Sequence, residues 1–213
     1  MITARRHWLG RLFWGPFIWV AIKLGFARLE VHGPAQPQSH APVLLLPNHW
    51  GWWDGFFQYE MNRRHWRKRF YLMMLEKVLG GFPFFRLIGA YSINPGHRSM
   101  LQSLAYTVQL LQDPRHLVVI YPQGRFESLH TPVPSLQQAF LKRLVPRLPA
   151  DTVVRLCVVL VDWGANPRPT ACLYYEDMAP PESGQALIAA WQAFYQRSIQ
   201  AQQARMDRLE GHA

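Results

Sequence analysis

Short apolar runs bounded by turn residues alternate with segments of helical periodicity along most of the chain. The runs have the length and continuous hydrophobicity of buried strands, and they cover residues 43–46, 70–75, 117–121, 153–161 and 171–175. Between them, two sets of apolar residues each share a helical face: Leu101, Leu104, Ala105, Val108 and Leu111, and then Leu136, Phe140 and Leu144. Strands that alternate with helices predict an α/β fold with a mixed, partly parallel sheet flanked by helices.

The two ends of the chain predict helices of different kinds. Near the carboxyl end, residues 185–205 place five large apolar side chains near one face, after Ser183 as a suitable N-cap. Near the amino end, residues 7–28 are strongly apolar, but only eleven uncharged residues separate Arg11 from Lys23. A bilayer span needs about 20 residues, so we expect this helix to lie in the membrane interface, with an ordinary buried helix as the alternative.

The chain divides into two parts. Residues 1–33 form the expected N-terminal, membrane-associating helical segment, and no small-residue cleavage site follows its apolar stretch, which disfavours a removable signal peptide. Residues 33–42 contain Pro34, Pro37 and Pro42 and predict a linker. Residues 34–213 are then expected to form one domain, because 213 residues suffice for one substantial core.

Charge and aromatic content together suggest a partner. The formal net charge of +10 predicts an anionic one, and nucleic acid, anionic lipid and phosphorylated substrates all satisfy it. Nine Trp and twelve Phe favour a bilayer interface, where indole rings and cations both reside. A basic run at residues 63–69 indicates either attraction to anionic lipid or a solvated helix end. No nucleic-acid recognition motif accompanies it, so we expect no nucleic-acid partner.

The sequence offers little for metal or redox chemistry. The two cysteines, Cys157 and Cys172, lack CxxC spacing and resemble small buried hydrophobic residues, which favours a reducing compartment such as the cytoplasm or its membrane face. The nine histidines show no paired ligand spacing, so we expect no metal site. The patterns GxSxG, GxGxxG and the P-loop are also missing from the sequence.

Candidate chemistry appears directly after the first predicted core strand. The segment 47–54 reads PNHWGWWD, where a strand should end and a helix begin. An imidazole whose one ring nitrogen is held by a carboxylate is a suitable base for a hydroxyl group, and His49 with Asp54 meets that description. A His and an Asp five positions apart often occur by chance, so this spacing alone favours a turn and its cap.

A second segment changes that balance. Residues 121–125 read YPQGR at the end of a later strand, where Gly124 permits close backbone approach and Arg125 offers charge to an anion. The presence of this second segment at a strand end favours a functional interpretation of His49 and Asp54.

Together these segments resemble the lysophospholipid and glycerophosphate acyltransferase family. Asn48, His49 and Asp54 match its first motif, an asparagine followed by HxxxxD. Residues 121–124 are similar to its third motif, which resembles FPEG followed by basic and hydroxyl residues. Residues 76–77, 81–83 and 89–93 look like its middle region. The resemblance covers about residues 42–163, and its motifs are specific in combination.

The resemblance implies an O-acyltransferase without cofactor or metal, acting at the cytoplasmic face of a membrane. Acyl-CoA or acyl carrier protein would supply a fatty acyl group to a lipid hydroxyl, most simply that of a lysophospholipid such as lysophosphatidate. His49 would be the general base and Asp54 its orienting partner, so residues 34–213 would be the catalytic domain. Expected substrate-binding residues are Asn48, Lys77, Arg98, Gln123, Gly124 and Arg125.

Departures from the family pattern bear on the acceptor. Family members that act on glycerophosphate acceptors usually have Glu where Gln123 stands and Arg where Phe126 stands. A basic residue generally follows the strand of their middle region, whereas Asn94 and Pro95 occupy that place and Arg98 comes later. The alternative acceptors are therefore non-phosphate hydroxyls, such as those of a glycolipid, a carotenoid glycoside or a lyso-aminolipid. The non-enzyme alternatives are a basic nucleic-acid-binding module and a lipid-binding scaffold.

Overall fold

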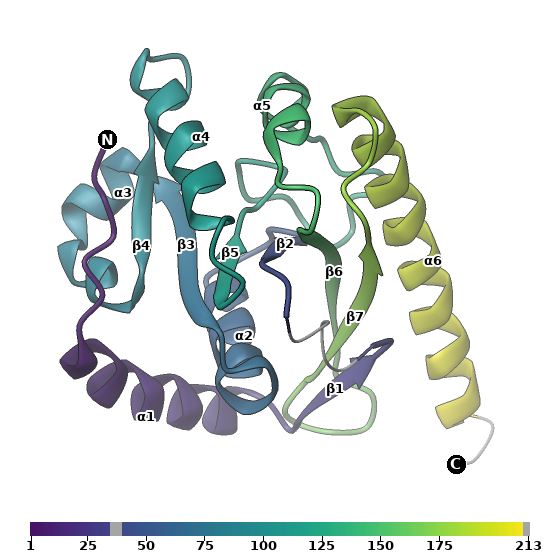
Figure 1. Ribbon diagram of the computed structural model, residues 1–213. Coiled ribbons are helices and arrows are strands. Elements are labelled where there is room, and N and C mark those ends of the chain that lie inside the picture. Colours follow the sequence, from purple (N-terminus) through teal and green to yellow (C-terminus); the bar gives the residue numbers. More distant parts are fainter. Residues whose placement is uncertain (35–39, 211–213) are drawn as a thin grey trace.

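The computed structural model describes residues 1–34 and 40–210, and it confirms the α/β fold with helices on both faces of one sheet (Figure 1). Seven strands lie in the order β1-β7-β6-β2-β5-β3-β4. Their bounds are β1 Arg28–His32, β2 Val43–Pro47, β3 Arg69–Leu75, β4 Ala90–Ile93, β5 His116–Val119, β6 Val153–Asp162 and β7 Thr170–Met178.

The strand directions determine where loops can meet. All neighbouring strands are parallel except β6 and β7, which are antiparallel. The carboxyl ends of β6, β2, β5, β3 and β4 therefore share one edge of the sheet. The loops that follow β2 and β5 are adjacent at this edge, because β2 pairs directly with β5 through Val43 and Leu117.

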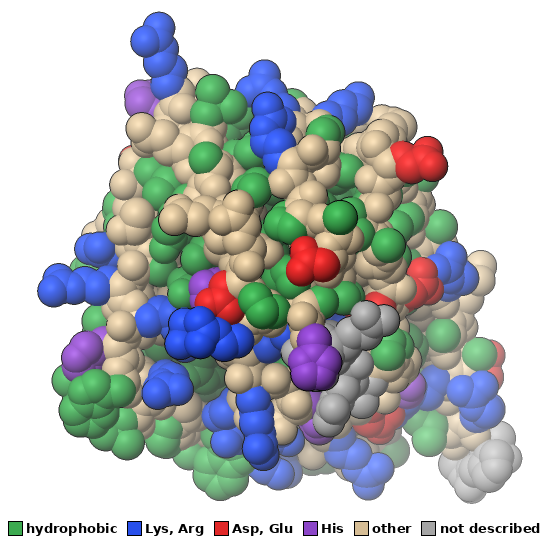
Figure 2. All heavy atoms as spheres, in the orientation of Figure 1, with side chains coloured by type: hydrophobic (Ala, Val, Ile, Leu, Met, Phe, Trp, Pro, Cys, Tyr) green, Lys and Arg blue, Asp and Glu red, His purple; other side chains and the backbone are tan. Residues whose placement is uncertain are grey.

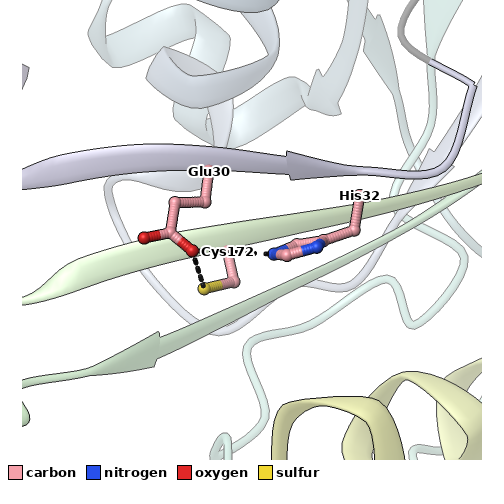
Figure 3. A group of neighbouring side chains, drawn as sticks. All are labelled: Glu30, His32 and Cys172. Atoms are coloured by element: carbon pink, nitrogen blue, oxygen red, sulfur yellow. Dashed lines mark hydrogen bonds and ion pairs between the residues drawn. The ribbon is translucent and has the colours of Figure 1, made fainter. Parts of the chain in front are cut away.

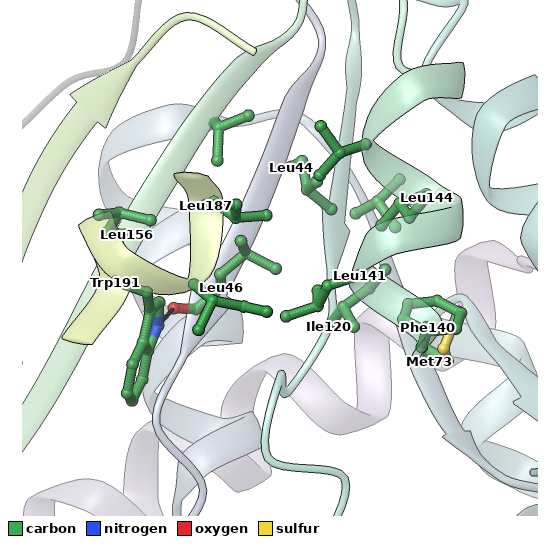
Figure 4. Close-up of a cluster of buried hydrophobic side chains, with 14 of the residues drawn as sticks. Leu44, Leu46, Met73, Ile120, Phe140, Leu141, Leu144, Leu156, Leu187 and Trp191 are labelled. Atoms are coloured by element: carbon green, nitrogen blue, oxygen red, sulfur yellow. Dashed lines mark hydrogen bonds between the residues drawn. The ribbon is translucent and has the colours of Figure 1, made fainter. Parts of the chain in front are cut away.

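Three helices cover one face of the sheet: α4 Ser99–Leu110, α5 Gln138–Leu144 and α6 Gly184–Glu210. Figure 4 shows their apolar side chains, such as Leu141 and Leu187, packed against Leu44 and Leu46 of β2. Trp191 is buried in this layer, and its indole N–H donates to the carbonyl of Leu46 at 3.0 Å. The strand that leads into the candidate site is thereby fixed from one side.

The opposite face is covered by α1 Trp8–Gly25 and α2 Asp54–Met61, with a π-helical turn at Asn62–Trp66. At the β4 end of the sheet lie α3 Glu76–Gly81 and a 3-10 helix at Pro83–Ile88, and a second 3-10 turn at Val145–Arg147 follows α5. Among the described residues, no helix is both long enough and apolar enough to cross a bilayer.

Two features differ from the sequence-based expectations. Residues 28–32 form β1, an edge strand paired in parallel with β7, where we expected the end of a helix. It is only five residues long and partly exposed, so its apolar pattern is weak. In α4, Leu101 is exposed, and Ser103 and Thr107 are buried instead, since their hydroxyls donate to backbone carbonyls. The predicted linker lies partly outside the described residues, and the domain division at residue 33 stays a prediction.

Candidate active site

The chain leaves β2 through an anchored asparagine. Asn48 is buried, and its side chain both donates to the carbonyl of Val159, at 3.0 Å, and accepts from the Val159 N–H, at 2.7 Å. Such a two-way amide contact extends the pairing of β2 with β6 by one residue. It fixes the direction in which the next residue, His49, leaves the sheet.

A carboxylate organises the loop around that histidine. Asp54, the first residue of α2, accepts a hydrogen bond from Nδ1 of His49 at 2.8 Å through its Oδ2 atom. The same oxygen accepts the backbone N–H groups of Trp50, at 2.8 Å, and Gly51, at 3.0 Å. The five-residue spacing of His49 and Asp54 thus closes a short loop around one carboxylate oxygen.

Burial gives this carboxylate an unusual environment. Asp54 is only 1% exposed. Burial raises the pKa of Asp54, and the hydrogen bonds from His49, Gly51 and Trp50 oppose that rise without cancelling it. A buried carboxylate aimed at a partly exposed histidine is typical of functional sites.

Aromatic rings form the walls around His49. Tyr121, which follows β5, stacks on the imidazole with ring centroids 4.0 Å apart and planes inclined by 19°. Phe126 lies against the imidazole at 4.2 Å between centroids. Trp50 and Trp53 are half-buried and Trp52 is exposed beside them, so the site is apolar around one polar centre.

The loop after β5 also holds the backbone of His49. The His49 N–H donates to Oε1 of Gln123 at 2.5 Å, and Nε2 of Gln123 donates to Oε2 of Glu127 at 3.0 Å. The Glu127 N–H donates to the carbonyl of His49 at 2.9 Å. Gln123 is 2% exposed, so its amide serves to position His49 within the protein.

Gly124 is required by the turn that forms this clamp. Its φ is +68°, and a Cβ atom there would lie 2.7 Å from Cγ of Gln137. Its N–H donates to the carbonyl of Tyr121 at 3.1 Å, so it is already engaged within the loop. The next residue, Arg125, is exposed and donates to Glu127 at 3.0 Å and to Ser135 at 3.1 Å.

The structure brings some of the expected site residues together and separates others. Asn48, His49, Asp54 and Gln123 share one network, whereas Lys77 follows β3 and Arg98 follows β4, two and three strands from β2. Both of these cations are exposed. The expected role of Lys77 and Arg98 in substrate binding stays a prediction.

Sequence reasoning did not assign a role to Glu127. Its carboxylate contacts Gln123, Arg125 and Ser135 in one cluster. A signal for it was present in the sequence, because Glu127 lies only four residues after Gln123 in the same segment. Tyr121 was named for its motif position alone, and its stacking on the imidazole becomes visible only in three dimensions.

A second cluster of polar side chains lies on β1 and β7 and contains residue types that can bind a metal ion. Atoms of Glu30, His32 and Cys172 lie within 4.8 Å of one another on β1 and β7 (Figure 3). However, both carboxylate oxygens of Glu30 accept hydrogen bonds from Arg205 at 2.8 Å. A cation would have to displace this guanidinium, so the group is better described as an ion pair with neighbours. Cys157 and Cys172 are both buried and free, as expected.

Several cations of the basic run at residues 63–69 form ion pairs or hydrogen bonds within the protein. Glu60 is fully buried, and its carboxylate accepts hydrogen bonds from both Arg63 and Arg64, at 2.7 and 2.5 Å. Lys68 donates to the carbonyls of Ala41 and Pro114. This run therefore stabilises the turn after α2, and only part of its charge can attract a partner.

Comparisons with known proteins agree with this geometry. A protein-family model described as Acyltransferase matches residues 28–143. The solved structure of the 1-acyl-sn-glycerophosphate acyltransferase PlsC from Thermotoga maritima has the same fold, with a TM-score of 0.60 and 14% sequence identity over 89% of this chain and 78% of that chain. A search among curated proteins found no match by sequence. Because the family model spans more than half of the 213 residues and includes both loops that surround His49, the protein belongs to the acyltransferase family.

Proposed function

We propose that this acyltransferase moves a fatty acyl group from an acyl thioester, acyl-CoA or acyl carrier protein, to a lipid hydroxyl, with His49 as general base. The observation that carries the proposal is the 2.8 Å contact between Nδ1 of His49 and Asp54 at the carboxyl end of β2. It fixes the imidazole so that Nε2, the other ring nitrogen, is the one that accepts a proton from the substrate.

The reaction is a direct transfer. Nε2 of His49 takes the proton of the acceptor hydroxyl while the hydroxyl oxygen attacks the thioester carbonyl carbon. The carbon–sulfur bond then breaks, and the thiol leaves with the proton that His49 carried. Asp54 stabilises the imidazolium between these steps, as a buried carboxylate hydrogen-bonded to Nδ1 can do.

The aromatic walls support the choice of acyl transfer over hydrolysis. Tyr121 and Phe126 both pack against the imidazole of His49, and Trp50, Trp52 and Trp53 lie in the loop that carries His49. Apolar rings around the base exclude water, which would otherwise compete with the acceptor for the thioester. The family resemblance favours a lysophospholipid acceptor such as lysophosphatidate, and Phe126 is the observation that favours a non-phosphate hydroxyl.

The surface of α1 supports a membrane location for this chemistry. Leu9, Phe13, Phe17, Val20 and Leu24 recur at helical spacing, and all five side chains are exposed. Figure 2 shows hydrophobic side chains, with Lys and Arg among them, along the lower edge of the molecule where α1 lies in Figure 1. An exposed apolar helix face flanked by cations is typical of proteins that bind at a bilayer interface.

An acyl-transfer assay tests the enzymatic proposal. Purified protein in lipid is given acyl-CoA or acyl carrier protein thioesters and a panel of lysophospholipids, glycosylated hydroxyls and lyso-aminolipids, and products are followed by mass spectrometry. We expect transfer by the wild type and a loss of about 10²- to 10⁴-fold in His49→Ala, the usual contribution of a general base. Equal transfer by both proteins would refute the role of His49.

Vesicle co-sedimentation tests the membrane proposal. Replacing Phe13 and Leu24 together by Ser removes two of the most exposed apolar side chains of α1. We expect binding to anionic vesicles to weaken by about 100-fold, because each of the two side chains contributes about 1.5 kcal/mol or more when it is buried. The matched control is Leu101→Ser, on α4, where an exposed leucine lies outside this helix. Unchanged binding by the α1 variant would contradict the proposal.

A further inference from the structure

We infer that the acceptor of this enzyme carries no anionic group beside its reacting hydroxyl. The inference rests on the proposed acyl transfer at His49 and narrows its substrate class. It excludes acceptors such as lysophosphatidate as preferred substrates, and it favours neutral acceptors such as a monoacylglycerol or a glycosylated lipid. The side chains of the loop after β5 carry the argument.

Phe126 is an exposed aromatic side chain that lies directly beside the imidazole of His49. Its ring lies 4.2 Å from the imidazole of His49, between centroids, while 62% of the residue remains exposed. A large apolar side chain in this position is the first surface that an acceptor meets beside His49. A phosphate placed there would lose water without gaining a hydrogen-bond donor, and the ring face is electron-rich. A neutral carbon skeleton or sugar face packs against such a ring without that loss.

The carboxylate behind this wall is ionised and already paired. Burial alone would raise the pKa of Glu127, but hydrogen bonds from Ser135, Gln123 and Arg125 together lower it, so the carboxylate is ionised at neutral pH. Its backbone N–H contacts the carbonyl of His49. The guanidinium of Arg125 lies 3.0 Å from this carboxylate, so the two charges largely cancel. An anionic acceptor therefore gains no electrostatic attraction from this loop.

The nearest cation of this loop is already engaged. Arg125 donates to the Glu127 carboxylate and to the Ser135 hydroxyl, so its charge is largely compensated. Lys77 and Arg98 follow strands two and three positions from β2 in the sheet, which is roughly 10 and 14 Å at the usual strand spacing. Within residues 121–127, the loop that holds Phe126, Arg125 is the one lysine or arginine.

The contact between Gln123 and Glu127 explains why an amide is needed at position 123. Gln123 accepts from the His49 N–H and simultaneously donates to Glu127 at 3.0 Å. A glutamate at position 123 could accept but not donate, and it would set two carboxylates against each other. The two residues therefore depend on one another, and together they build a loop without an anion site.

A competition assay tests this inference. A monoacylglycerol and the lysophosphatidate with the same acyl chain are offered at equal density in zwitterionic vesicles, and kcat/KM is measured for each. We expect the wild type to prefer the neutral acceptor by about tenfold or more. Phe126→Arg, alone or with Glu127→Ser, should shift the ratio toward lysophosphatidate by about tenfold, since it adds a charge-assisted donor. Phe126→Leu, the apolar control, should retain the wild-type preference.

Two outcomes would overturn the inference: a wild type that prefers lysophosphatidate, or a ratio that Phe126→Arg leaves unchanged. Binding of the two acceptors to wild type and Phe126→Arg without acyl donor, followed by tryptophan fluorescence, separates this failure from failure of the proposed function. If neither of these two acceptors is acylated, the binding ratio still decides the inference, and the wider acceptor panel decides the proposed acyl transfer. A tenfold shift toward lysophosphatidate in the arginine variant supports the inference, and an equal ratio overturns it.

Discussion

His49 and Asp54 on one side of the sheet, and His32 and Glu30 on another, are both histidine–carboxylate pairs, but they differ in distance and in surroundings. Nδ1 of His49 lies 2.8 Å from its carboxylate, whereas Nε2 of His32 lies 3.8 Å from Glu30. The first distance is a hydrogen bond and the second is not.

The other partners of each carboxylate make the larger difference. Asp54 accepts only from His49 and backbone N–H groups in its loop, so its charge is directed at the imidazole. Glu30 is paired through both oxygens with Arg205, which lowers its pKa. Burial lowers the pKa of His32, which favours the neutral form. We therefore expect His49, whose acid has no competing cation among the described residues, and not His32, whose acid is paired with Arg205, to act as a base.

The largest effect that sharpens this comparison is expected from Asp54→Asn. The amide can still accept from the Trp50 and Gly51 N–H groups but cannot stabilise an imidazolium, so kcat should fall by about 10²-fold or more. Because burial raises the pKa of Asp54, its ionised form is less favourable in the folded than in the unfolded chain. The thermal midpoint of the variant should therefore equal or exceed that of the wild type at neutral pH, as measured by calorimetry. A stable variant with wild-type kcat would contradict the assigned role.

The corresponding change in the other pair, Glu30→Gln, should have the opposite effect: it should reduce stability and leave activity nearly unchanged. Activity should remain within about twofold, while stability falls by about 1 kcal/mol, because the pair with Arg205 is partly exposed. The folded-state pKa of Glu30 is lowered, so its stabilisation is present above the unfolded value of 4.5 and is lost as the pH falls through the lower folded value. Unfolding measured from pH 7 downward should show wild type and variant converging. A constant difference at all pH values would contradict the ion-pair account.

A third change, Gln123→Glu, breaks the clamp beside the first pair and is expected to act on stability. The new carboxylate would face Glu127 across the 3.0 Å contact, which raises the pKa of one of the two acids. A raised pKa makes the folded state relatively less stable as the pH increases, so the variant should lose about 1–3 kcal/mol between pH 5 and pH 8 relative to wild type. Adding Glu127→Ser should restore most of this loss. If Glu127→Ser did not restore stability, repulsion between the carboxylates at positions 123 and 127 would not be the cause of the loss.

The sequence predicted the buried parts of the fold well because hydrophobic runs and helical periodicity follow burial directly. The strands β2, β3, β5, β6 and β7 and helix α6 appear close to the predicted positions. Edge strand β1 escaped prediction because it is half-exposed, and the buried face of α4 was misjudged at Leu101 because Ser103 and Thr107 satisfy their hydroxyls within the helix layer. The spacing of apolar residues does not show which polar side chains can be buried through hydrogen bonds to the backbone.

The site shows the same division. The His49 and Asp54 pair was predictable, because a five-residue spacing after a strand permits their contact. The motif resemblance then favoured a functional role for that contact. Stacking by Tyr121, the wall formed by Phe126 and the network of Glu127 depend on how the loop after β5 folds over the loop after β2. The contacts that Tyr121, Phe126 and the Glu127 N–H make with His49 join residues more than 70 positions apart, so no local pattern could reveal them.

The most direct test of the account is the rate of acyl transfer by wild type, His49→Ala and His32→Ala, measured side by side with one acceptor that the wild type uses. We expect His49→Ala to lose about 10²- to 10⁴-fold and His32→Ala to stay within about twofold of wild type. Equal rates for wild type and His49→Ala, or an equal loss in both variants, would contradict the claim that the pair of His49 and Asp54 is the catalytic base.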